Sequence, residues 1–426
     1  MTIKTILNRL ALAIGIAGFA VSAGASAAGK APIRIGGLAT LEGAFAVDGK
    51  DAMRGIEMAI EEFGGEIDGH PIKLVKASSD ASPNSAVDAA RKLIEQEDVD
   101  ILVGPLSGSE GLAVKDYAKK HPGKTFLNGS SAAQDTTLRD PARNFYRFST
   151  DGAQWMAGLG DYVYKQKGYR KVAVVSEDYS FPYTQVFGFA YEFCRNGGEI
   201  SHKYWVPIGN KDYSAVITRL PEDIDAIYVM LGGSDAVNFL TQYRQYGGSK
   251  PMIGSSVTVD QTVLSSKGPF KQYVLGTASA GPIADSWDNP EWASFVKRYQ
   301  KAYPDGFPSP SLFAETYYVN AKAALLALRQ VGGDLSDGQK QLQKTLDSLS
   351  FQTPTGHVAL DENREGISNN FVTVVAKKPN GDLYNKVVAV KKDVDQTLGM
   401  KRDAFLELGK VGRNSPTCED LRNVGK

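Results

Sequence analysis

The stretch Val99-Asp-Ile-Leu-Val-Gly-Pro-Leu-Ser-Gly-Ser-Glu-Gly-Leu-Ala113 decides how the chain folds. Its apolar run 101–103 ends at Gly104-Pro105 and predicts a short strand buried on both faces. Apolar residues then recur at helical spacing up to Ala118, which predicts a helix. The turn between them is rich in serine and glycine. Backbone N–H groups at the positive end of a helix bind a carboxylate or another small anion. The alternative is an ordinary turn in which serine only caps the helix.

The same order of strand, turn and helix recurs along the chain. Strands are predicted at 33–38, 72–77, 101–103, 124–128, 144–148, 172–175, 200–206, 226–230, 252–254 and 274–280, with a hairpin at 370–376 and 383–390. Helices are predicted at about 51–63, from 83, at 112–118, 154–167, from 182, at 213–220, 234–246, 289–303, 312–331 and 340–349, with a loop at 43–50 and an irregular end from 400. This alternation indicates an α/β fold of doubly wound parallel sheets, and its restart near residue 149 indicates two lobes. Ligands of such sheets bind beyond the carboxyl ends of the strands.

The composition is that of an ordinary globular protein. The 426 residues are 42% hydrophobic, with 48 Lys and Arg against 48 Asp and Glu. Because there is no basic excess, nothing points to nucleic acid or to an anionic membrane surface as a partner.

The N-terminus has the pattern of a signal peptide. Lys4 and Arg9 precede an apolar run, 10–21, that is too short to span a bilayer. Ala25-Ser-Ala27 supplies the small residues of a cleavage site, so we expect residues 1–27 to be removed. No cysteine near the cut offers a lipid anchor. We therefore expect an exported, unanchored, monomeric protein of the periplasm, with a net charge of −2 after cleavage.

Two cysteines, Cys194 and Cys418, are present. In an oxidising compartment they favour a disulfide that ties the C-terminal tail to the second lobe; the alternative is two unpaired thiols. The four histidines show no ligand spacing, so neither a metal nor another cofactor is expected.

An enzyme is a weaker interpretation than a binding protein. The sequence has no dinucleotide fingerprint, phosphate loop or nucleophile elbow. Ser109 or Ser131 could act as the nucleophile of a hydrolase, but no histidine or lysine base is placed beside them.

The predicted strand exits carry aromatic and acidic residues. Phe45, Tyr179 and Phe181 are expected to form ligand walls, with packing between the lobes as the alternative, whereas Tyr183 is not assigned. The acids at these exits could form an acid/base pair, although capping or solvation is the commoner role. They are Glu177, Asp178, Asp235 and Asp260.

Four stretches in their order and spacing resemble one family. They are Ile33-Arg-Ile-Gly-Gly-Leu with Gly43-Ala-Phe-Ala, Val103-Gly-Pro-Leu-Ser, Lys211-Asp-Tyr-Ser-Ala and Ser311-Leu-Phe-Ala-Glu-Thr-Tyr. Over about residues 31 to 390 the chain resembles the periplasmic solute-binding proteins of ABC transporters, of the leucine-isoleucine-valine type. The resemblance implies a type I periplasmic binding protein fold, with two lobes joined by three crossing segments. The lobes would comprise residues 28–148 with about 281–352, and 149–280 with about 353–399, followed by a tail at 400–426.

The resemblance also implies a ligand site in the cleft. The family grips a ligand carboxylate with the turn that here is Ser107, Gly108 and Ser109, and with the loop Ser130, Ser131 and Ala132. An aromatic side chain falls on Phe181. The carboxylate with which amino-acid binders hold the ligand ammonium falls on Ser256, and another residue near the ammonium falls on Ser234. An ammonium buried without a counter-charge is costly. We therefore expect acids or amides without an α-ammonium to bind better than leucine, isoleucine or valine.

The resulting hypothesis is an exported receptor that captures a small carboxylate or amide, an aromatic one included, and presents it to the permease subunits of an ABC transporter. The first alternative is an amino-acid receptor in which Asp235 or Asp260 holds the ammonium. The others are a periplasmic sensor and, from another class, the serine hydrolase.

Overall fold

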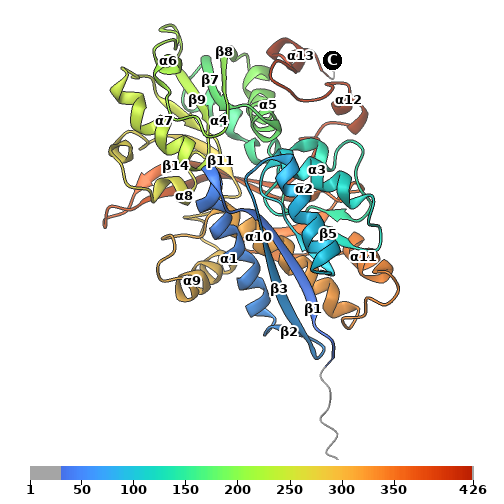
Figure 1. Ribbon diagram of the computed structural model, residues 1–426. Coiled ribbons are helices and arrows are strands. Elements are labelled where there is room, and N and C mark those ends of the chain that lie inside the picture. The colour runs from blue at the N-terminus through green and yellow to red at the C-terminus, as the bar shows by residue number, and fades with distance from the viewer. Residues whose placement is uncertain (1–29, 425–426) are drawn as a thin grey trace, which may run out of the picture.

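The computed structural model describes residues 30–424, so the predicted signal peptide lies outside the described residues. Two sheets form the framework, one above the other in Figure 1. The first contains β1 (Ile33–Thr40), β2 (Glu66–Ile67), β3 (His70–Ser79), β4 (Ile101–Val103), β5 (Thr125–Leu127) and β6 (Phe145–Tyr146). The second contains β7 (Lys171–Glu177), β8 (Glu199–Val206), β9 (Ala226–Met230), β10 (Met252–Gly254), β11 (Ala278–Gly281), β12 (Phe351–Thr353), β13 (Gly356–Leu360), β14 (Gly366–Lys377) and β15 (Leu383–Val394).

Helices cover both sheets. The α-helices are α1 (Ala46–Glu62), α2 (Pro83–Arg91), α3 (Gly108–Ala118), α4 (Leu159–Lys165), α5 (Ser180–Arg195), α6 (Ser214–Ile217), α7 (Gly233–Gln245), α8 (Gln261–Leu264), α9 (Pro290–Ala302), α10 (Leu312–Gln330), α11 (Lys340–Asp347), α12 (Arg402–Leu406) and α13 (Cys418–Asn423). Short 3-10 helices are η1 (Gly43–Phe45), η3 (Gln134–Thr136), η4 (Gln154–Met156) and η5 (Pro269–Gln272), and η2 (Lys92–Gln96) is a π-helix.

The strand order is that of two doubly wound sheets. The first runs β2-β3-β1-β4-β5-β6 and is parallel except at its β2 edge. The second runs β12-β13-β14-β11-β10-β9-β7-β8, with β15 paired to β14; its β8-to-β11 part is parallel and its β14 side antiparallel. We call the first sheet with α1, α2, α3 and α9–α11 lobe 1, and the second sheet with α4–α8 lobe 2.

The chain passes between the lobes three times. It crosses after β6, returns after β11 to α9 and α10, which pack on α1, and crosses again between α11 and β12. At the first crossing, the fully buried Arg147 donates to Glu365 at 2.5 Å and to the carbonyls of Ser131 and Ala133. The Arg147–Glu365 pair therefore fixes the loop after β5, at the carboxyl edge of the first sheet.

The central stretch folds as predicted. Apolar residues of β4 pair with β1 on one side and β5 on the other, with Ile101 opposite Ile35 and Val103 opposite Leu127. Gly104 has φ of 143°, and a Cβ there would lie 2.2 Å from the carbonyl oxygen of Leu38. Only glycine fits this turn, because a larger residue would meet the backbone of the neighbouring strand.

Several predicted elements were wrong. The segment 43–50, expected as a loop, forms η1 and the first turn of α1. The helix expected over 154–167 is interrupted at Gly158, where φ is 91°. The strand expected from Val274 begins only at β11, and the helix expected over 213–220 shortens to α6. The end of the chain, expected to be irregular, contains α12 and α13.

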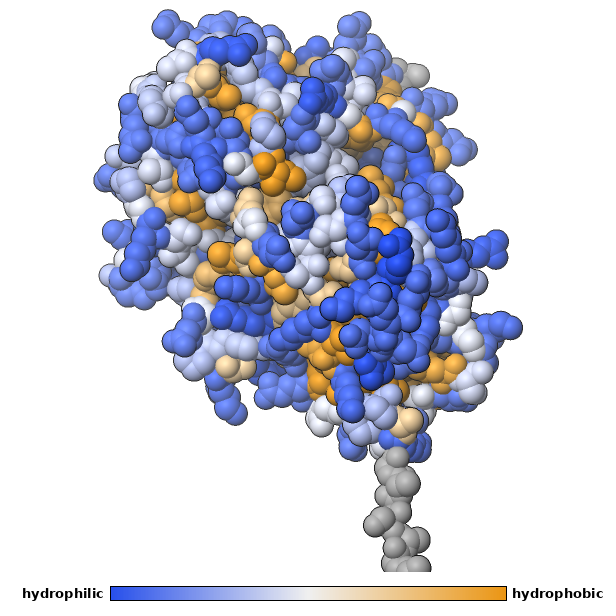
Figure 2. Space-filling view, viewed as in Figure 1, coloured by the Kyte–Doolittle hydropathy of each residue, from blue (hydrophilic) through white to orange (hydrophobic). Residues whose placement is uncertain are grey.

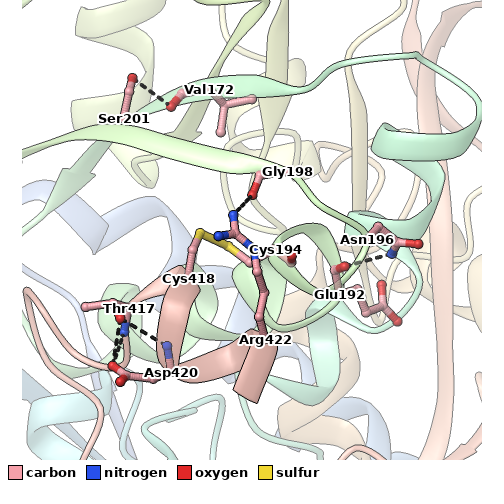
Figure 3. The surroundings of a disulfide bond; sticks show 10 residues. All are labelled: Val172, Glu192, Cys194, Asn196, Gly198, Ser201, Thr417, Cys418, Asp420 and Arg422. Atoms are coloured by element: carbon pink, nitrogen blue, oxygen red, sulfur yellow. Dashed lines mark hydrogen bonds between the residues drawn. A yellow bond between two sulfur atoms is a disulfide. The ribbon is translucent and has the colours of Figure 1, made fainter. Parts of the chain in front are cut away.

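The C-terminal segment packs on α5, as Figure 1 shows at the upper right. The predicted disulfide between Cys194 of α5 and Cys418 of α13 is present and is shown in Figure 3. Beside it, the Arg422 guanidinium donates to the carbonyls of Cys194 and Gly198. Hydrophilic residues dominate the face in Figure 2, with apolar residues in small separate groups. None of the helices between residues 30 and 424 has the length and apolar character that crossing a bilayer requires.

Candidate functional site

A small cavity of about 20 Å³ lies between the lobes, at the carboxyl ends of their parallel strands. Residues of both lobes line it: Phe45, Asp48, Leu106, Ser107, Ser130, Trp155, Tyr179, Phe181, Gly232, Val257 and Phe313. A larger, open groove lies over α1, α9 and α10. Its Glu62 pairs with Arg298 and Lys322 within the fold. The cavity between the lobes is therefore the candidate ligand site, because strand ends are where such sheets bind ligands.

The start of α3 forms one end of the cavity. Ser107 caps this helix, since its hydroxyl accepts from the N–H of Glu110, whose carboxylate accepts from the N–H of Ser107. The Ser107 hydroxyl also donates to the carbonyl of Ala81 at 3.1 Å, and that of Ser130 donates to the carbonyl of Leu106 at 3.2 Å. The capping alternative is thus confirmed, and because Ser107 also lines the cavity, anion binding at this turn stays a prediction.

The next two residues of α3 touch the other lobe. The hydroxyls of Ser109 and of Ser180 in lobe 2 are hydrogen-bonded at 3.1 Å. A Cβ added to Gly108 would lie 2.8 Å from the Cβ of Phe181 and 3.0 Å from its backbone nitrogen. Gly108 and Ser109, both predicted ligand residues, therefore lie outside the cavity lining and form a contact between the closed lobes.

Ser131 and Ala132 do not line the cavity. The Ser131 hydroxyl is buried, with no partner among residues 30–424, against Gly111 of α3, where an added Cβ would meet it at 1.7 Å. The carbonyl of Ala132 accepts from the N–H of Gly152 at 2.9 Å. In this closed structure the two residues support the site from behind.

Aromatic rings form most of the wall. Phe45, Tyr179 and Phe181 line the cavity, as the sequence predicted. The Tyr179 ring centroid lies 6.3 Å from that of Phe45 and also 6.3 Å from that of Phe181. Trp155 and Phe313 also line it and were not predicted. The Trp155 ring meets the Phe181 ring edge-on at 5.6 Å, and its buried indole N–H has no partner within the described residues. Tyr183 packs instead on Trp205.

The other predicted polar residues lie outside the lining. Ser234 is exposed, and the hydroxyl of Ser256 accepts from the Gln185 amide at 2.7 Å. Asp235 accepts from the N–H of Gly209 at 2.7 Å. Asp260 caps α8 and accepts from the N–H of Leu312 at the start of α10, at 2.8 Å. The structure thus gives Asp235 and Asp260 partners within the fold, and it does not bring Ser234 to the cavity.

Burial raises the pKa values of both Asp235 and Asp260. It raises the pKa of Asp235 to about 6, against the Gly209 hydrogen bond, and that of Asp260 to about 7, against its backbone hydrogen bonds. A raised pKa arises because a buried carboxylate loses the hydration that stabilises its charge.

The acid that does line the cavity is Asp48, which the sequence argument missed. It is fully buried on the first turn of α1, and neither carboxylate oxygen has a hydrogen-bond partner within the described residues. Burial and then the charge of Asp260 raise its pKa well above its ordinary value; the nearby Thr262 hydroxyl opposes this, although it lies outside hydrogen-bonding geometry. Asp48 was not among the predicted site residues, because the segment expected as a loop is helical and turns Asp48 toward the cavity.

Glu177 lies behind the cavity wall at the end of β7. One of its oxygens accepts from the N–H of Gly232 at 2.9 Å, and the other is buried without a partner in the described chain. Burial raises its pKa well above the ordinary value, and the charges of Asp235 and Asp48 add to this. The sequence singled out Glu177 as a strand-exit acid but did not place it at the ligand.

Comparison with known proteins gives matches among solute-binding proteins, the class that the sequence stretches resemble. The family described as periplasmic binding protein matches residues 32–381. A "Leu/Ile/Val-binding protein homolog 6" of Brucella melitensis is 24% identical over 372 residues, covering 86% of this chain and 93% of that protein. An ABC transporter substrate-binding protein from Sphaerobacter thermophilus has a TM-score of 0.76 at 27% identity, covering 86% of this chain and 99% of that one. An ABC transporter solute-binding protein from Rhodopseudomonas palustris, in complex with 3,4-dihydroxybenzoic acid, has a TM-score of 0.78 at 24% identity, covering 86% and 98%.

Proposed function

Since the chain belongs to the periplasmic binding protein family, we propose that it is the exported solute-binding receptor of an ABC uptake system. It acts as a monomer in the periplasm, without catalysis, and delivers its ligand to membrane permease subunits. The closed cavity between the lobes carries this proposal, because residues of both lobes line it and a ligand held there would bridge them. The proposal includes the lobe boundaries near residues 148, 281, 352 and 399.

The ligand is a small carboxylate or amide with an apolar body, an aromatic body included. At one end of the cavity, Ser107 and Ser130 lie beside the positive end of α3, where the first N–H groups lack helical partners. To donate to a ligand carboxylate, their hydroxyls would turn away from the carbonyls of Ala81 and Leu106. Trp155 supplies a further N–H without a partner. The rings of Phe45, Tyr179 and Phe181 favour a flat ligand, since aromatic pairs contribute about 0.5–1.5 kcal/mol beyond their buried area.

An amino acid is the second candidate. Asp48 favours it, because a buried carboxylate without a partner can neutralise an ammonium group. Asp48 would then take the part assigned from the sequence to Asp235 or Asp260. The naming of the Brucella melitensis relative is consistent with this candidate.

A thermal-shift screen followed by calorimetry tests the proposal. Leucine, 4-methylpentanoate, phenylalanine, 3-phenylpropanoate and the primary amides of both acids are added to the exported protein. A ligand at 100 times its Kd stabilises a receptor by about 2.7 kcal/mol, so binding raises the unfolding temperature. Stabilisation by at least one of these compounds, with a 1:1 stoichiometry, supports a solute receptor. No stabilisation by any of them contradicts this ligand class.

A further inference from the structure

The C-terminal segment, 395–424, follows β15 and lies beyond residue 381, where the family match ends. Figure 1 shows its helices α12 and α13 beside α5. We propose that this segment acts as a strap: it is anchored to lobe 2, grips lobe 1, and shifts the equilibrium between open and closed lobes toward the closed form. The inference rests on the proposed receptor function, whose ligand the closed form encloses, and it concerns how firmly that form is held.

The anchor on lobe 2 is covalent and buried. Cys418, the first residue of α13, is joined by the disulfide to Cys194, which is fully buried on α5. Leu421, one turn later on α13, is also fully buried and belongs to one apolar cluster with Phe187 of α5. Helix α13 therefore moves with lobe 2, because a covalent bond and a buried apolar contact hold it on the same helix.

The grip on lobe 1 falls on the loop between β5 and β6. The Arg139 guanidinium of this loop donates to the carbonyls of Gly409, at 2.6 Å, and of Leu406, at 3.5 Å. Within lobe 1, Asp135 holds the same guanidinium at 2.8 Å. The donor of these hydrogen bonds is charged, which makes each of them stronger than a hydrogen bond between neutral groups.

An apolar contact joins the segment to both lobes. Phe405 of α12 is 1% exposed, and its ring centroid lies 5.8 Å from that of Phe187 in lobe 2, with the rings edge-on. The same cluster contains Leu138 of lobe 1, whose carbonyl accepts from Arg402 at 3.0 Å. Rotation of lobe 1 away from lobe 2 would break this cluster and the Arg139 hydrogen bonds, or would pull the segment off α5, where the disulfide holds it.

The segment lies at an edge where the closed lobes already touch. There η3 of lobe 1 meets α5 of lobe 2, since the N–H of Gln134 donates to the Thr184 hydroxyl at 3.3 Å. Arg413 of the segment donates to Asp178 at 2.7 Å, and Asp178 directly precedes Tyr179 of the cavity wall. The contacts of the segment therefore reach from the loop before β6 to the loop after β7. A hold that spans this edge opposes separation of the lobes there.

A contact made in the closed form acts on ligand affinity through the population of that form. The apparent Kd is the intrinsic Kd divided by the fraction of protein that is competent to hold the ligand. Weakening the strap lowers this fraction without altering the cavity, because no residue of 395–424 lines it. The effect should fall on release, since changes within one interface act mostly on the dissociation rate.

Two arginines give a matched pair of variants. Arg139→Ala removes a donor from lobe 1 to the segment; Arg422→Ala, the control, removes a donor from the segment to lobe 2, where the disulfide keeps the anchor. Each guanidinium donates to two carbonyls. Phe405→Ala empties the shared cluster. The variants are compared with the wild type by small-angle X-ray scattering without ligand. They are then titrated with whichever of leucine, 4-methylpentanoate, phenylalanine, 3-phenylpropanoate and the two amides stabilises the wild type.

Arg139→Ala should raise Kd and the dissociation rate about three- to tenfold, and Phe405→Ala about tenfold or more, whereas Arg422→Ala should stay within about twofold of the wild type. The radius of gyration without ligand should be larger in Arg139→Ala and Phe405→Ala than in Arg422→Ala. In a protein that also carries Cys194→Ser and Cys418→Ser, Arg139→Ala should have a smaller effect, because the freed segment no longer links the lobes.

Unchanged Kd in both Arg139→Ala and Phe405→Ala overturns the strap while keeping the receptor. An equal effect of Arg139→Ala with and without the disulfide also overturns it, because the effect would then be local to lobe 1. If none of the compounds binds the wild type, the proposed ligand class fails, and the scattering measurement alone decides on the strap: equal radii of gyration in all variants then overturn it.

Discussion

Closure of the lobes depends on a glycine at the first position of α3. Replacing Gly108 by alanine should weaken ligand binding without destabilising lobe 1. The added Cβ would meet Phe181 of lobe 2 at 2.8 Å from its Cβ and 3.0 Å from its backbone nitrogen. Neither is the flexible end of a side chain, so the lobes would have to move apart. The Gly108 backbone is not in the left-handed region, and alanine is the better helix former.

The size of the effect follows from overpacking. Inserting a methyl group into a tightly packed contact costs about 1–3 kcal/mol. The contacts with Phe181 form only when the lobes close, so their penalty falls on closure. The looser third contact, 3.1 Å from the Cβ of Ala133, lies within lobe 1 and does not depend on closure. At about 1.4 kcal/mol per factor of ten, Kd should rise roughly 5- to 150-fold.

The assay is calorimetric titration with whichever compound of the screen stabilises the wild type, alongside denaturant unfolding of the unliganded protein. Gly123→Ala is the matched control, because Gly123 is exposed and an added Cβ would meet nothing closer than 3.9 Å. It should bind as the wild type does. An unchanged Kd in Gly108→Ala, with normal unfolding, would show that ligand binding does not require this approach of the lobes and would refute the reasoning.

Three further outcomes are expected. Ser130→Ala should weaken binding of a carboxylate by about tenfold or more, since a hydrogen bond to a charged group contributes about 1.5–3 kcal/mol; an unchanged Kd in titration would remove Ser130 from the anion site. The Cys194→Ser, Cys418→Ser double variant should unfold at lower denaturant, because a cross-link over 224 residues contributes on the order of 5 kcal/mol in the chain-entropy model; an unchanged midpoint would contradict this. Burial raises the pKa of Asp260 to about 7, so its protonated form stabilises the fold below pH 4, and this contribution is lost as the pH rises through 7. The contribution to the unfolding free energy is at most on the order of 4 kcal/mol. Asp260→Asn should flatten the fall in unfolding free energy between pH 5 and 8, and equal slopes in the variant and the wild type would argue against it.

Much of the framework follows from local sequence patterns. The apolar run 101–103, the Ser82-Pro83 helix start and the hairpin of β14 and β15 each carry their signal within a few residues. Ser82 caps α2 by accepting from the N–H of Ser85, as its position before proline predicts. The aromatic walls were also predictable in part, because Phe45, Tyr179 and Phe181 come within a few residues of the ends of β1 and β7.

The acid in the cavity was not predictable in the same way. The segment 43–50 contains two glycines and reads as a loop, yet α1 begins at Ala46. The reason is tertiary: a Cβ on Gly49 would lie 1.9 Å from the carbonyl oxygen of Thr40, so the helix packs directly on the end of β1 and only glycine fits there. This packing overrides the weak helix propensity of glycine and sets the direction of Asp48.

The hydrogen-bond partners of the other predicted site residues also come from distant parts of the chain. Asp260 finds the N–H of Leu312, 52 positions later, and Ser256 finds the amide of Gln185, 71 positions earlier. No local pattern distinguishes an acid with such a partner from one without. The cavity lies at the strand ends that the sequence singled out, but sequence reasoning could not tell which of their acids have partners within the described residues.

The C-terminal segment adds contacts that the family region does not include, since the family match ends at residue 381. The disulfide at Cys194 fixes it to lobe 2 (Figure 3). From there it reaches lobe 1, where the Arg139 guanidinium donates to the carbonyl of Gly409 at 2.6 Å and Arg402 donates to that of Leu138 at 3.0 Å. Phe405 packs in one apolar cluster with Phe187 of lobe 2 and Leu138 of lobe 1. The closed arrangement that encloses Asp48 is thus held at α3 by contacts within the family fold, and at Leu138 by a segment covalently attached to the opposite lobe.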